Sequence, residues 1–355
     1  MEKRIRVGVL LGGKSDEHDV SVMSAVSVMK HLDPRRFQIR PVGISRQGHW
    51  IELTEPYAAL GEAFLEEGRL TALVAQADAA TTEQALTALR RDMDVVFPVL
   101  HGPFGEDGTV QGLCEMLGVP YVGAGVTASA LCMDKGHTKR ILRDAGVPVV
   151  PWAELLRFEY RSDAGGCIQA VEALLSYPLF VKPANLGSSV GISKAKDQVE
   201  LAAAIETAFR YDRKILIEQG IDCRELECAV LGNEAPEASC VGEIIPAHEF
   251  YDYEAKYFCD GQSKILIPAP IDDAVSETIR SYALQAYRLL GVTGLSRVDF
   301  FQDRASGAIL LNEINTMPGF TKFSMYPMMW TESGLTYGAL LERLIALALE
   351  DRGAV

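Results

Sequence analysis

Two short apolar segments in the last fifth of the chain constrain its fold most, because each carries oxygen ligands. Asp299 lies in the run VDFF, Glu313 follows the run ILL, and Asn315 stands two residues after Glu313. We predict two adjacent strands, in which alternation places Glu313 and Asn315 on one face. Carboxylates on buried strands are unfavourable unless a partner neutralises them. The three side chains predict a site for a hard cation such as Mg²⁺, shared with phosphate oxygens; the alternative, acids facing solvent, does not explain the apolar flanks.

Length and composition indicate a multidomain globular protein. The 355 residues exceed the usual size of one hydrophobic core and predict two or three domains. A hydrophobic content of 48% with 23% charged residues is typical of a soluble protein, and no apolar stretch reaches membrane-spanning length. The net charge of −14 argues against nucleic acid or an anionic membrane as a partner.

Cysteine usage and the N-terminal residues indicate the compartment. The seven cysteines are scattered and contain no Cys-x-x-Cys pair, which is typical of reduced thiols rather than disulfides or zinc ligands. The start, MEKRIRVGVLLGG, passes directly from charge into a short strand-like run and lacks the cleavage site of a signal peptide. We therefore expect a cytoplasmic protein.

The first third of the chain alternates predicted strands with helices. Residues 4–11, 37–44 and 94–100 are strand-like apolar runs, and residues 20–32 show helical spacing. This alternation predicts an α/β domain with a parallel sheet, which we assign to residues 1–133.

Polar residues follow these predicted strands at their carboxyl ends, where ligands gather in parallel sheets. Gly12 and Gly13 with Glu17 follow the first strand, and His101 with Glu106 follows the third. His101 could contact a substrate, or could be a structural histidine with satisfied hydrogen bonds.

Beyond residue 133 the pattern changes. A helix is predicted over 134–146, and two strands joined by a loop rich in glycine and serine over 178–193. Residues 246–268 combine aromatic and charged residues with little periodicity, which predicts a functional loop. We assign residues 134–220 and 221–355 to a second and a third domain.

The segment FVKPANLGSSVG indicates phosphate binding. Lys182 ends a predicted buried strand and needs an anionic partner. The backbone N–H groups and hydroxyls of the following loop could cradle phosphate, although a plain hairpin explains the loop alone equally well. Glu218 and Glu225 could accept hydrogen bonds from an adenine amino group or ribose hydroxyls, but either acid alone could be a solvated charge.

Six motifs in a fixed order indicate a family. LGGKSDEHDVS and HGPFGEDGTVQG are followed by VKPANLGSSVGISK, EQGIDCRELECAVLG, FYDYEAKY and the segment from SRVDFF to LNEINTMPGFT. In this order they closely resemble the D-alanine–D-alanine ligases of the ATP-grasp superfamily, over about residues 10–345. The resemblance implies a three-domain α/β ATP-grasp architecture. It also implies ATP-dependent joining of two D-alanine molecules through a D-alanyl phosphate, for peptidoglycan precursor synthesis, and we expect a homodimer.

The resemblance further implies how the nucleotide is held. Two Mg²⁺ or Mn²⁺ ions would bridge the phosphates of ATP to the three oxygen ligands named above. Lys135 and Lys182 would hold the phosphates, and Lys256 would reach the γ-phosphate. Glu218 and Glu225 would hold the adenine and the ribose.

Roles for the amino-acid substrates follow from the same resemblance. Glu17 would meet the ammonium group of the first D-alanine. Arg297 and the backbone N–H of Gly319 would stabilise the tetrahedral oxyanion formed when the second D-alanine attacks. Ser324 and Met325 match positions that line the pocket of the second substrate.

A latch over the site is also implied. In the family, the positions of Glu17, Ser188 and Tyr257 form a hydrogen-bonded triad, and residues 250–268 would form the lid. Closure is needed because an acyl phosphate hydrolyses readily in water. Each residue alone could have a purely structural role.

Three alternative functions remain open from the sequence. One is a ligase that forms D-alanyl-D-serine or D-alanyl-D-lactate, although Tyr257 counts against lactate. Another is a non-catalytic nucleotide sensor, which the intact lysine, arginine and metal positions disfavour. The third is a kinase that stops at a phosphorylated carboxylate; Arg297 and the residues of the second-substrate pocket favour a ligase.

Overall fold

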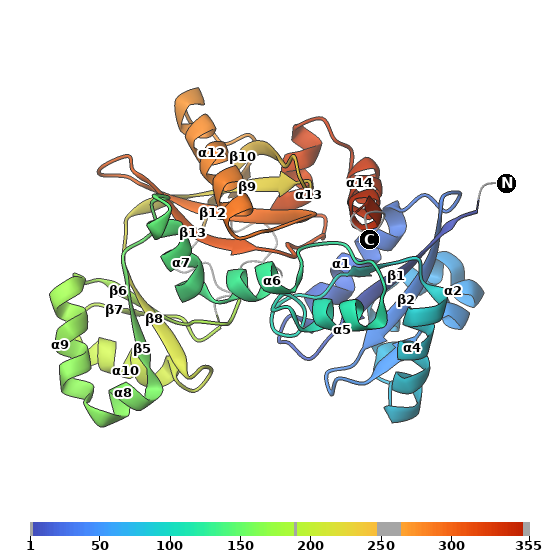
Figure 1. The fold of residues 1–355 in the computed structure, drawn as a ribbon, viewed down its shortest axis with the longest axis horizontal. Coiled ribbons are helices and arrows are strands. Elements are labelled where there is room, and N and C mark those ends of the chain that lie inside the picture. Colours follow the sequence, from blue (N-terminus) through green and yellow to red (C-terminus); the bar gives the residue numbers. More distant parts are fainter. Residues whose placement is uncertain (1–2, 188–189, 247–263, 351–355) are drawn as a thin grey trace.

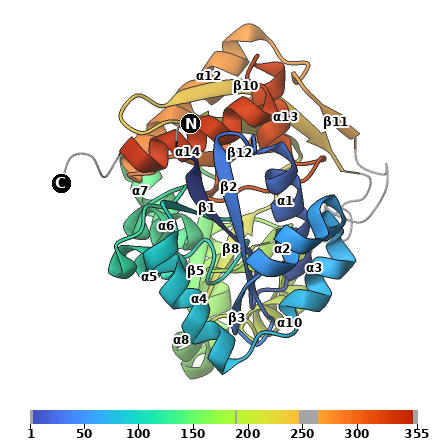
Figure 2. The same cartoon turned by 90° about the vertical axis from the view of Figure 1, so that its right-hand side faces the viewer.

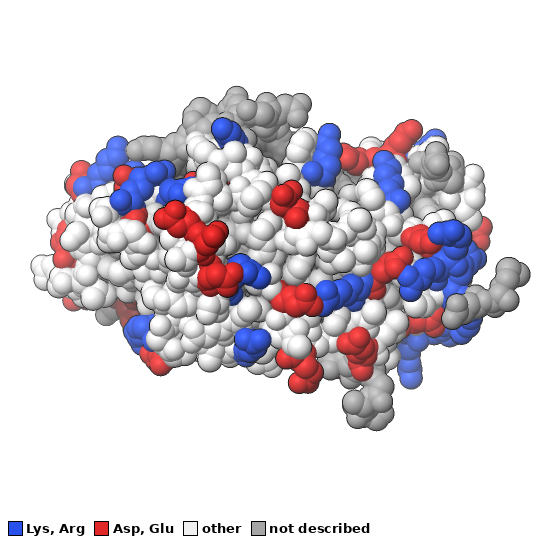
Figure 3. Space-filling model, turned by 90° about the horizontal axis from the view of Figure 1, so that it is seen from above, with Lys and Arg blue, Asp and Glu red and all other residues white. Residues whose placement is uncertain are grey.

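Three β-sheets organise the molecule, for which the computed structural model describes residues 3–187, 190–246 and 264–350, without the side chains of 60–62. The first sheet lies at one end of the longest axis, the second at the other end, and the third between and above them (Figure 1). No helix among the described residues is long and apolar enough to cross a membrane. Basic and acidic side chains alternate on the face seen from above, without an extended basic patch (Figure 3).

The first sheet has the order β3-β2-β1-β4 and is parallel except for the edge strand β3. Its strands are β1 (Ile5–Gly12), β2 (Phe37–Ile44), β3 (Trp50–Glu52) and β4 (Val95–Pro98). Its helices are α1 (His18–His31), α2 (Thr54–Leu60), the 3₁₀ helix η1 (Gly61–Leu65), α3 (Glu67–Val74), α4 (Ala79–Asp92), α5 (Thr109–Leu117) and α6 (Val126–Met133). Helices α1 and α3 cover one face and α4 and α5 the other (Figure 2), which explains why β1 is apolar and buried from Val7 to Gly12.

The second sheet is antiparallel, with the order β5-β8-β6-β7. Its strands are β5 (Trp152–Leu156), β6 (Leu179–Pro183), β7 (Ser193–Ala195) and β8 (Lys214–Gln219). The neighbouring helices are α7 (Lys135–Asp144), α8 (Arg157–Ser162), α9 (Ala164–Leu174) and α10 (Gln198–Ala208). One face packs on α9 and α10 through Leu179, Val181, Ile215 and Ile217. By alternation, Lys182 and Glu218 lie on the opposite face.

The third sheet is also antiparallel, with the order β11-β10-β9-β12-β13. Its strands are β9 (Cys223–Leu231), β10 (Glu237–Ile245), β11 (Lys264–Leu266), β12 (Leu295–Asp303) and β13 (Ile309–Asn315). Its helices are α12 (Asp273–Leu289), α13 (Met325–Glu332) and α14 (Tyr337–Glu350). The short strand β11 falls inside the loop predicted over 246–268. The apolar pattern missed it because backbone pairing to β10, rather than a buried face, defines this edge strand.

Alternation along β9, β12 and β13 separates a hydrophobic face from a polar face. Val298 and Phe300 on β12 pack against α12 together with Leu226 and Val230 of β9. The intervening positions on all three strands point to the other side, so this face carries Glu225 and Glu227 of β9, Arg297 and Asp299 of β12, and Glu313 of β13.

The C-terminal helices join the third sheet to the first. Helix α14 contacts α1 and β4, and α13 contacts β9 and β10. The hydroxyl of Tyr337 on α14 lies 3.0 Å from Ser27 Oγ on α1 and donates a hydrogen bond to the Phe320 carbonyl at 2.7 Å. The ring of Phe320 lies edge-on to Phe97 of β4, with centroids 5.5 Å apart. The segment after β13 is therefore held by the first sheet.

Candidate active site

The polar face of the third sheet brings the predicted metal ligands together. The strand register places Asp299 opposite Glu313, and Arg297 opposite Asn315. Arg297 Nε and Nη2 donate to the two Asp299 oxygens, each at 2.7 Å, and Asn315 Nδ2 donates to Asp299 Oδ2 at 3.0 Å. The predicted strands and the shared face of Glu313 and Asn315 are thus confirmed.

A further carboxylate on this face was not predicted. Glu227 on β9 lies opposite Asp299 in the register, and its Oε2 is 3.0 Å from Arg297 Nε. Arg297 therefore lies between two acids. The signal was present in the alternation of RELEC, which puts Glu225 and Glu227 on the same side of β9.

The donor set of this face fits a divalent cation that also binds phosphate. Among the described residues, no three His, Cys, Asp or Glu side chains group as a self-contained metal site. The two carboxylates Asp299 and Glu313 with the Asn315 amide form an incomplete set of hard oxygen ligands. Mg²⁺ is commonly held by one or two carboxylates together with substrate phosphates, so an incomplete protein shell is the expected one.

The second sheet contributes a buried cluster of two lysines and one glutamate. Lys182 Nζ lies 2.6 Å from Glu218 Oε2, and Lys139 Nζ lies 3.0 Å from Glu218 Oε1. Glu218 is thus the anionic partner that Lys182 requires. Burial acts to raise the pKa of Glu218, but the two lysines outweigh it and hold the pKa below its usual value. Lys139 was not predicted as part of the site.

Lys135 links the faces of the second and third sheets. Its Nζ lies 3.5 Å from Glu313 Oε2 and donates to the Leu186 carbonyl at 2.6 Å. Lys135 is only 8% exposed at the start of α7. A cation held between a carboxylate of one sheet and the loop after β6 of the other is suitably placed for a polyphosphate lying between them.

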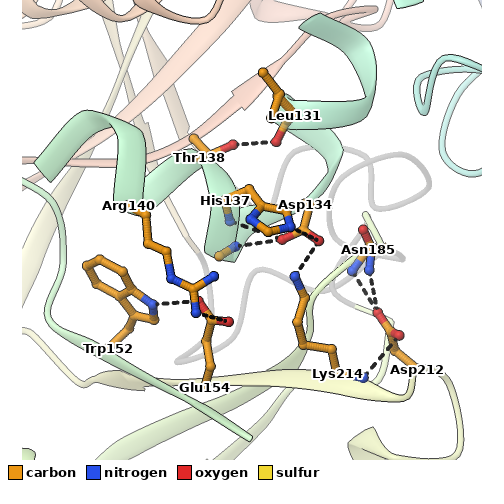
Figure 4. Close-up of polar contacts among 11 residues, drawn as sticks. Leu131, Asp134, His137, Thr138, Arg140, Trp152, Glu154, Asn185, Asp212 and Lys214 are labelled. Atoms are coloured by element: carbon orange, nitrogen blue, oxygen red, sulfur yellow. Dashed lines mark hydrogen bonds and ion pairs between the residues drawn. The ribbon is translucent and has the colours of Figure 1, made fainter. Parts of the chain in front are cut away.

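The start of α7 is fixed by a network of polar contacts (Figure 4). Asp134 caps the helix by accepting from the backbone N–H groups of Gly136 and His137, both at 3.1 Å, and pairs with Lys214 of β8. Glu154 of β5 lies so near that a Cβ on Gly136 would be 2.5 Å from Glu154 Oε1. Capping and close packing together set the position of Lys135.

Hydrogen bonds to Asp212 and to the start of α7 fix the beginning of the loop after β6. Asn185 donates to Asp212 Oδ2 from its side chain at 2.8 Å and from its backbone N–H at 3.0 Å (Figure 4). The backbone N–H of Lys135 donates to the Ala184 carbonyl at 3.2 Å. These contacts order the residues that precede the Gly- and Ser-rich loop.

A cavity of about 840 Å³ lies beside this network, bordered by α7, α8 and residues 212–214. None of the described residues that line it is one of the predicted site residues. Two ion pairs already neutralise charged groups of its lining, Arg140 with Glu154 at 2.8 Å and Lys214 with Asp134. We therefore place the site at the facing charged surfaces of the second and third sheets.

Glu17 comes to this site from the first sheet. It precedes α1, is 7% exposed, and lies against two loops that contain glycine. A Cβ on Gly102 would be 2.6 Å from Glu17 Oε2, and one on Gly187 would be 3.4 Å away. Gly102 also has φ +70°, a backbone conformation that residues with a side chain rarely adopt. Both the close approach of Glu17 and this conformation therefore favour glycine at position 102. Glu17 thus lies close to Gly187, the residue directly before Ser188.

The loop that carries Gly319 is held by the first domain. His101 Nδ1 lies 3.1 Å from the Met317 carbonyl, and its Nε2 lies 3.1 Å from Ser24 Oγ. Ser24 Oγ also accepts from the Phe320 backbone N–H at 3.2 Å. Burial lowers the pKa of His101, which favours a neutral ring. Both ring nitrogens are engaged within the chain, as the structural interpretation of His101 requires.

Glu106 holds the same loop and is a buried carboxyl group. It accepts from the Gly102 backbone N–H at 2.8 Å and from the backbone N–H of Met317. Burial, followed by the negative charge of Glu17, raises the pKa of Glu106 to about 8. Glu106 is therefore protonated at neutral pH, where an ionised group would be poorly solvated.

The residues predicted for the second-substrate pocket lie just after this loop. Ser324 approaches Gly319 so closely that a Cβ there would be 2.7 Å from Ser324 Oγ, and this hydroxyl accepts from the Thr321 N–H at 2.9 Å. The Met325 side chain is buried in the hydrophobic core, where a Cβ on Gly242 would meet its methyl group. Ser188, Lys256 and Tyr257 lie outside the described residues.

Comparison with known proteins agrees with this arrangement. The family model described as the D-ala D-ala ligase N-terminus matches residues 6–124, and that of the D-ala D-ala ligase C-terminus matches residues 141–346. The D-alanine–D-alanine ligase of Thermoanaerobacter pseudethanolicus is 49% identical, covering 99% of this chain and 98% of the relative. That of Acetivibrio thermocellus is 47% identical, covering 99% and 97% respectively.

Solved structures show the same fold. The D-alanine–D-alanine ligase from Coxiella burnetii has a TM-score of 0.82 at 36% identity, covering 99% of this chain and 96% of its own. The VanG D-Ala:D-Ser ligase from Enterococcus faecalis has a TM-score of 0.83 at 37% identity, covering 98% of this chain and 100% of its own. The α/β ATP-grasp architecture expected from the sequence is confirmed, and the chain belongs to the D-alanine–D-alanine ligase family.

Proposed function

We propose that this chain joins two D-alanine molecules to D-alanyl-D-alanine, with conversion of ATP to ADP and phosphate, for cell-wall precursor synthesis in the cytoplasm. One observation carries the proposal. The acidic face of the third sheet, with Arg297 between Asp299 and Glu227, is joined through Lys135 to the Lys182–Glu218 face of the second. Acids for a metal, lysines for phosphates and an arginine for an oxyanion are the groups that this reaction needs.

The nucleotide would lie between the two sheets. Lys135 and Lys182 would bind its phosphates, and Glu218 and Glu225 would accept hydrogen bonds from the adenine and the ribose. Asp299, Glu313 and Asn315 would hold Mg²⁺ or Mn²⁺, in our proposal two ions, and a bound ion would neutralise phosphate charge. Phosphoryl transfer depends mainly on positioning and charge neutralisation, so no covalent enzyme intermediate is required.

The first step activates one D-alanine. Glu17 would bind its ammonium group, which leaves the carboxylate directed at the γ-phosphate. A carboxylate oxygen forms a bond to the γ-phosphorus, the bond from this phosphorus to the β–γ bridging oxygen breaks, and ADP leaves with that electron pair. Lys256 would contact the transferred phosphoryl group. Ser188 and Tyr257 would hold the lid closed, so that water does not reach the acyl phosphate.

The second step forms the peptide bond. The second D-alanine, held near His101, Ser324 and Met325, first releases one ammonium proton to solvent. Its neutral amine nitrogen then attacks the acyl carbon and loses a second proton, which the departing phosphate accepts. Arg297 and the Gly319 backbone N–H would stabilise the oxyanion of the tetrahedral intermediate. The bond from the acyl carbon to the phosphate oxygen then breaks, and phosphate leaves. His101 and Glu106 place the Gly319 loop by holding Met317.

A second candidate is ligation of D-alanine to D-serine. The observation that favours it is the 37% identity to the VanG D-Ala:D-Ser ligase. One hydroxyl changes little in a tolerant pocket, so the same fold accommodates either product. The curated relatives named above are D-alanine–D-alanine ligases at 47–49% identity, and we therefore give D-alanine precedence.

The test is ADP release coupled to product identification by mass spectrometry. The enzyme with ATP and Mg²⁺ is supplied with D-alanine alone, and with D-alanine plus D-serine or D-lactate. We expect D-alanyl-D-alanine as the main product and ADP release only when D-alanine is present. A dominant mixed product would establish the alternative ligase, ADP without any dipeptide a kinase, and nucleotide binding without turnover a sensor.

Assembly, metal content and domain division are part of the same proposal. We propose a homodimer and the division 1–133, 134–220 and 221–355. Light scattering would measure the oligomeric state, and titration of Mn²⁺ into the enzyme with ADP would count the ions. Proteolysis at the proposed boundaries would test the division.

A further inference from the structure

Lys139 is a completely buried lysine to which no role has so far been assigned. It lies on α7 at 0% exposure, whereas Arg140, Arg143 and Asp144 of the same helix are exposed. Its Nζ is 3.0 Å from Glu218 Oε1, while Lys182 Nζ is 2.6 Å from Glu218 Oε2. Lys139 and Lys182 thus share one carboxylate.

The charges of this cluster do not cancel. When both lysines are protonated, two ammonium groups and one carboxylate leave one surplus positive charge. Burial and the neighbouring Lys182 lower the pKa of Lys139, so this charge is unfavourable until an anion arrives. If Lys139 were absent, Lys182 and Glu218 would form a closed, neutral pair. Lys139 therefore changes the cluster from a structural ion pair into a group that can accept a phosphate.

Hydrogen bonding in the cluster is also incomplete. Within the described part of the chain, neither Lys139 Nζ nor Glu218 Oε1 has a partner with hydrogen-bond geometry, although the two atoms are in contact. Buried polar groups are normally paired, and unpaired ones often mark a place where a ligand or water completes the shell. Glu218 thus retains an acceptor site. Burial lowers the pKa of Lys139, and the charge of Glu218 opposes this.

We propose that Lys139 is a positioning residue of the nucleotide site: it keeps Glu218 ionised and in place, so that Lys182 can leave Glu218 for a nucleotide phosphate. The inference rests on the proposed function only in assuming that a nucleotide binds between the second and third sheets. It differs from a structural role because a lysine that only supports packing would change stability without a specific effect on phosphate binding.

A double-mutant cycle with Glu218 tests this. Lys139→Met, Glu218→Gln and the double variant are titrated with AMP-PNP and with adenosine in the presence of Mg²⁺. In protein that keeps Glu218, Lys139→Met should weaken AMP-PNP binding about 10–100-fold. This is the scale found when residues that support a binding site are removed. Adenosine lacks phosphates and should lose less, because only its contact with Glu218 is affected.

The most specific test compares the effect of Lys139→Met on AMP-PNP binding with and without the Glu218 carboxylate. In the Glu218→Gln background there is no carboxylate to retain Lys182, so adding Lys139→Met should weaken AMP-PNP binding only about twofold, because the two changes are not additive. Arg40→Met is the matched control. It breaks an ion pair of 2.7 Å with Glu52 in the first sheet and should leave nucleotide affinity unchanged.

Several results would overturn the inference. Unchanged AMP-PNP affinity in Lys139→Met, equal losses for AMP-PNP and adenosine, or equal losses in both Glu218 backgrounds would each refute it. If Lys139→Met does not fold, Lys139→Gln carries the same expectation. Wild-type enzyme that binds AMP-PNP but forms no dipeptide would refute the proposed function alone, and wild type that does not bind AMP-PNP would refute both.

Discussion

Glu106 provides a direct test of the electrostatics of the site. Its pKa is about 8 in the folded chain against 4.5 for the ordinary group, because burial and the Glu17 charge disfavour ionisation. At pH values between these two pKa values, the native state therefore binds one more proton than the unfolded state. Stability is full below the unfolded pKa and is lost as pH rises through the folded pKa, by about 1.4 kcal/mol per pH unit and about 5 kcal/mol in total.

Glu106→Gln should remove this dependence while preserving the contacts. The amide oxygen can still accept from the backbone N–H group of Gly102. Urea unfolding at pH 5.5, 6.5 and 7.5 would give the free energy of unfolding of both proteins. From pH 5.5 to 7.5, the wild type should lose about 2.7 kcal/mol relative to the variant.

A matched control separates this effect from the loss of any carboxylate. Glu83 is exposed on α4, and Glu83→Gln should keep the pH dependence of the wild type. If Glu106→Gln also kept that dependence, Glu106 would not titrate near pH 8 in the folded chain. The account of a neutral Glu106 holding Met317 would then be wrong.

Three further substitutions test the proposed chemistry. Glu313→Gln should retain the fold but lower turnover by orders of magnitude, since a charge facing the metal is lost; near-normal turnover at saturating Mg²⁺ would contradict the assignment. Arg297→Lys should reduce kcat by about 10²–10³-fold with little change in the KM for ATP, because a planar fork and a point charge are not interchangeable, whereas a loss mainly in ATP affinity would reassign Arg297 to phosphate binding. Tyr257→Phe should remain active and form ester with D-lactate near neutral pH, since one neutral hydrogen bond contributes only about 0.5–1.5 kcal/mol to closure; an ester-to-amide ratio equal to that of the wild type would exclude the role in nucleophile choice.

The sequence predicted best those elements whose pattern is local. The apolar residues between positions 272 and 290 recur at helical spacing, which indicates an amphipathic helix, and this segment forms α12 from Asp273 to Leu289 with one face on the third sheet. The two ligand-bearing strands form as expected, because apolar runs flank Asp299 and Glu313. In these segments periodicity alone determines both the element and its buried face.

Tertiary packing decided what the sequence did not predict. Lys139 stands in KRILRD, where charge suggests a solvated helix. It is buried because α7 lies against the second sheet, where Lys139 meets Glu218 and Arg140 meets Glu154. The spacing of Lys135, Lys139 and Leu142 on one helical face was the available signal. Glu106 was noted beside His101, but its role depends on Met317, more than 200 residues away in the chain.

Helix α14 has a consequence for the order in which the molecule can assemble. It closes the core of the first sheet and, through Tyr337, also contacts the carbonyl of the residue after Gly319. The first sheet therefore cannot complete its core during synthesis until the chain has been made through α14, far beyond its own strands. Such distant contacts are slow to form and leave an apolar surface open to chaperones and to aggregation meanwhile. The same docking event orders the loop that carries Gly319, the proposed oxyanion donor, so a partly made chain that has begun to fold still lacks the complete proposed active site.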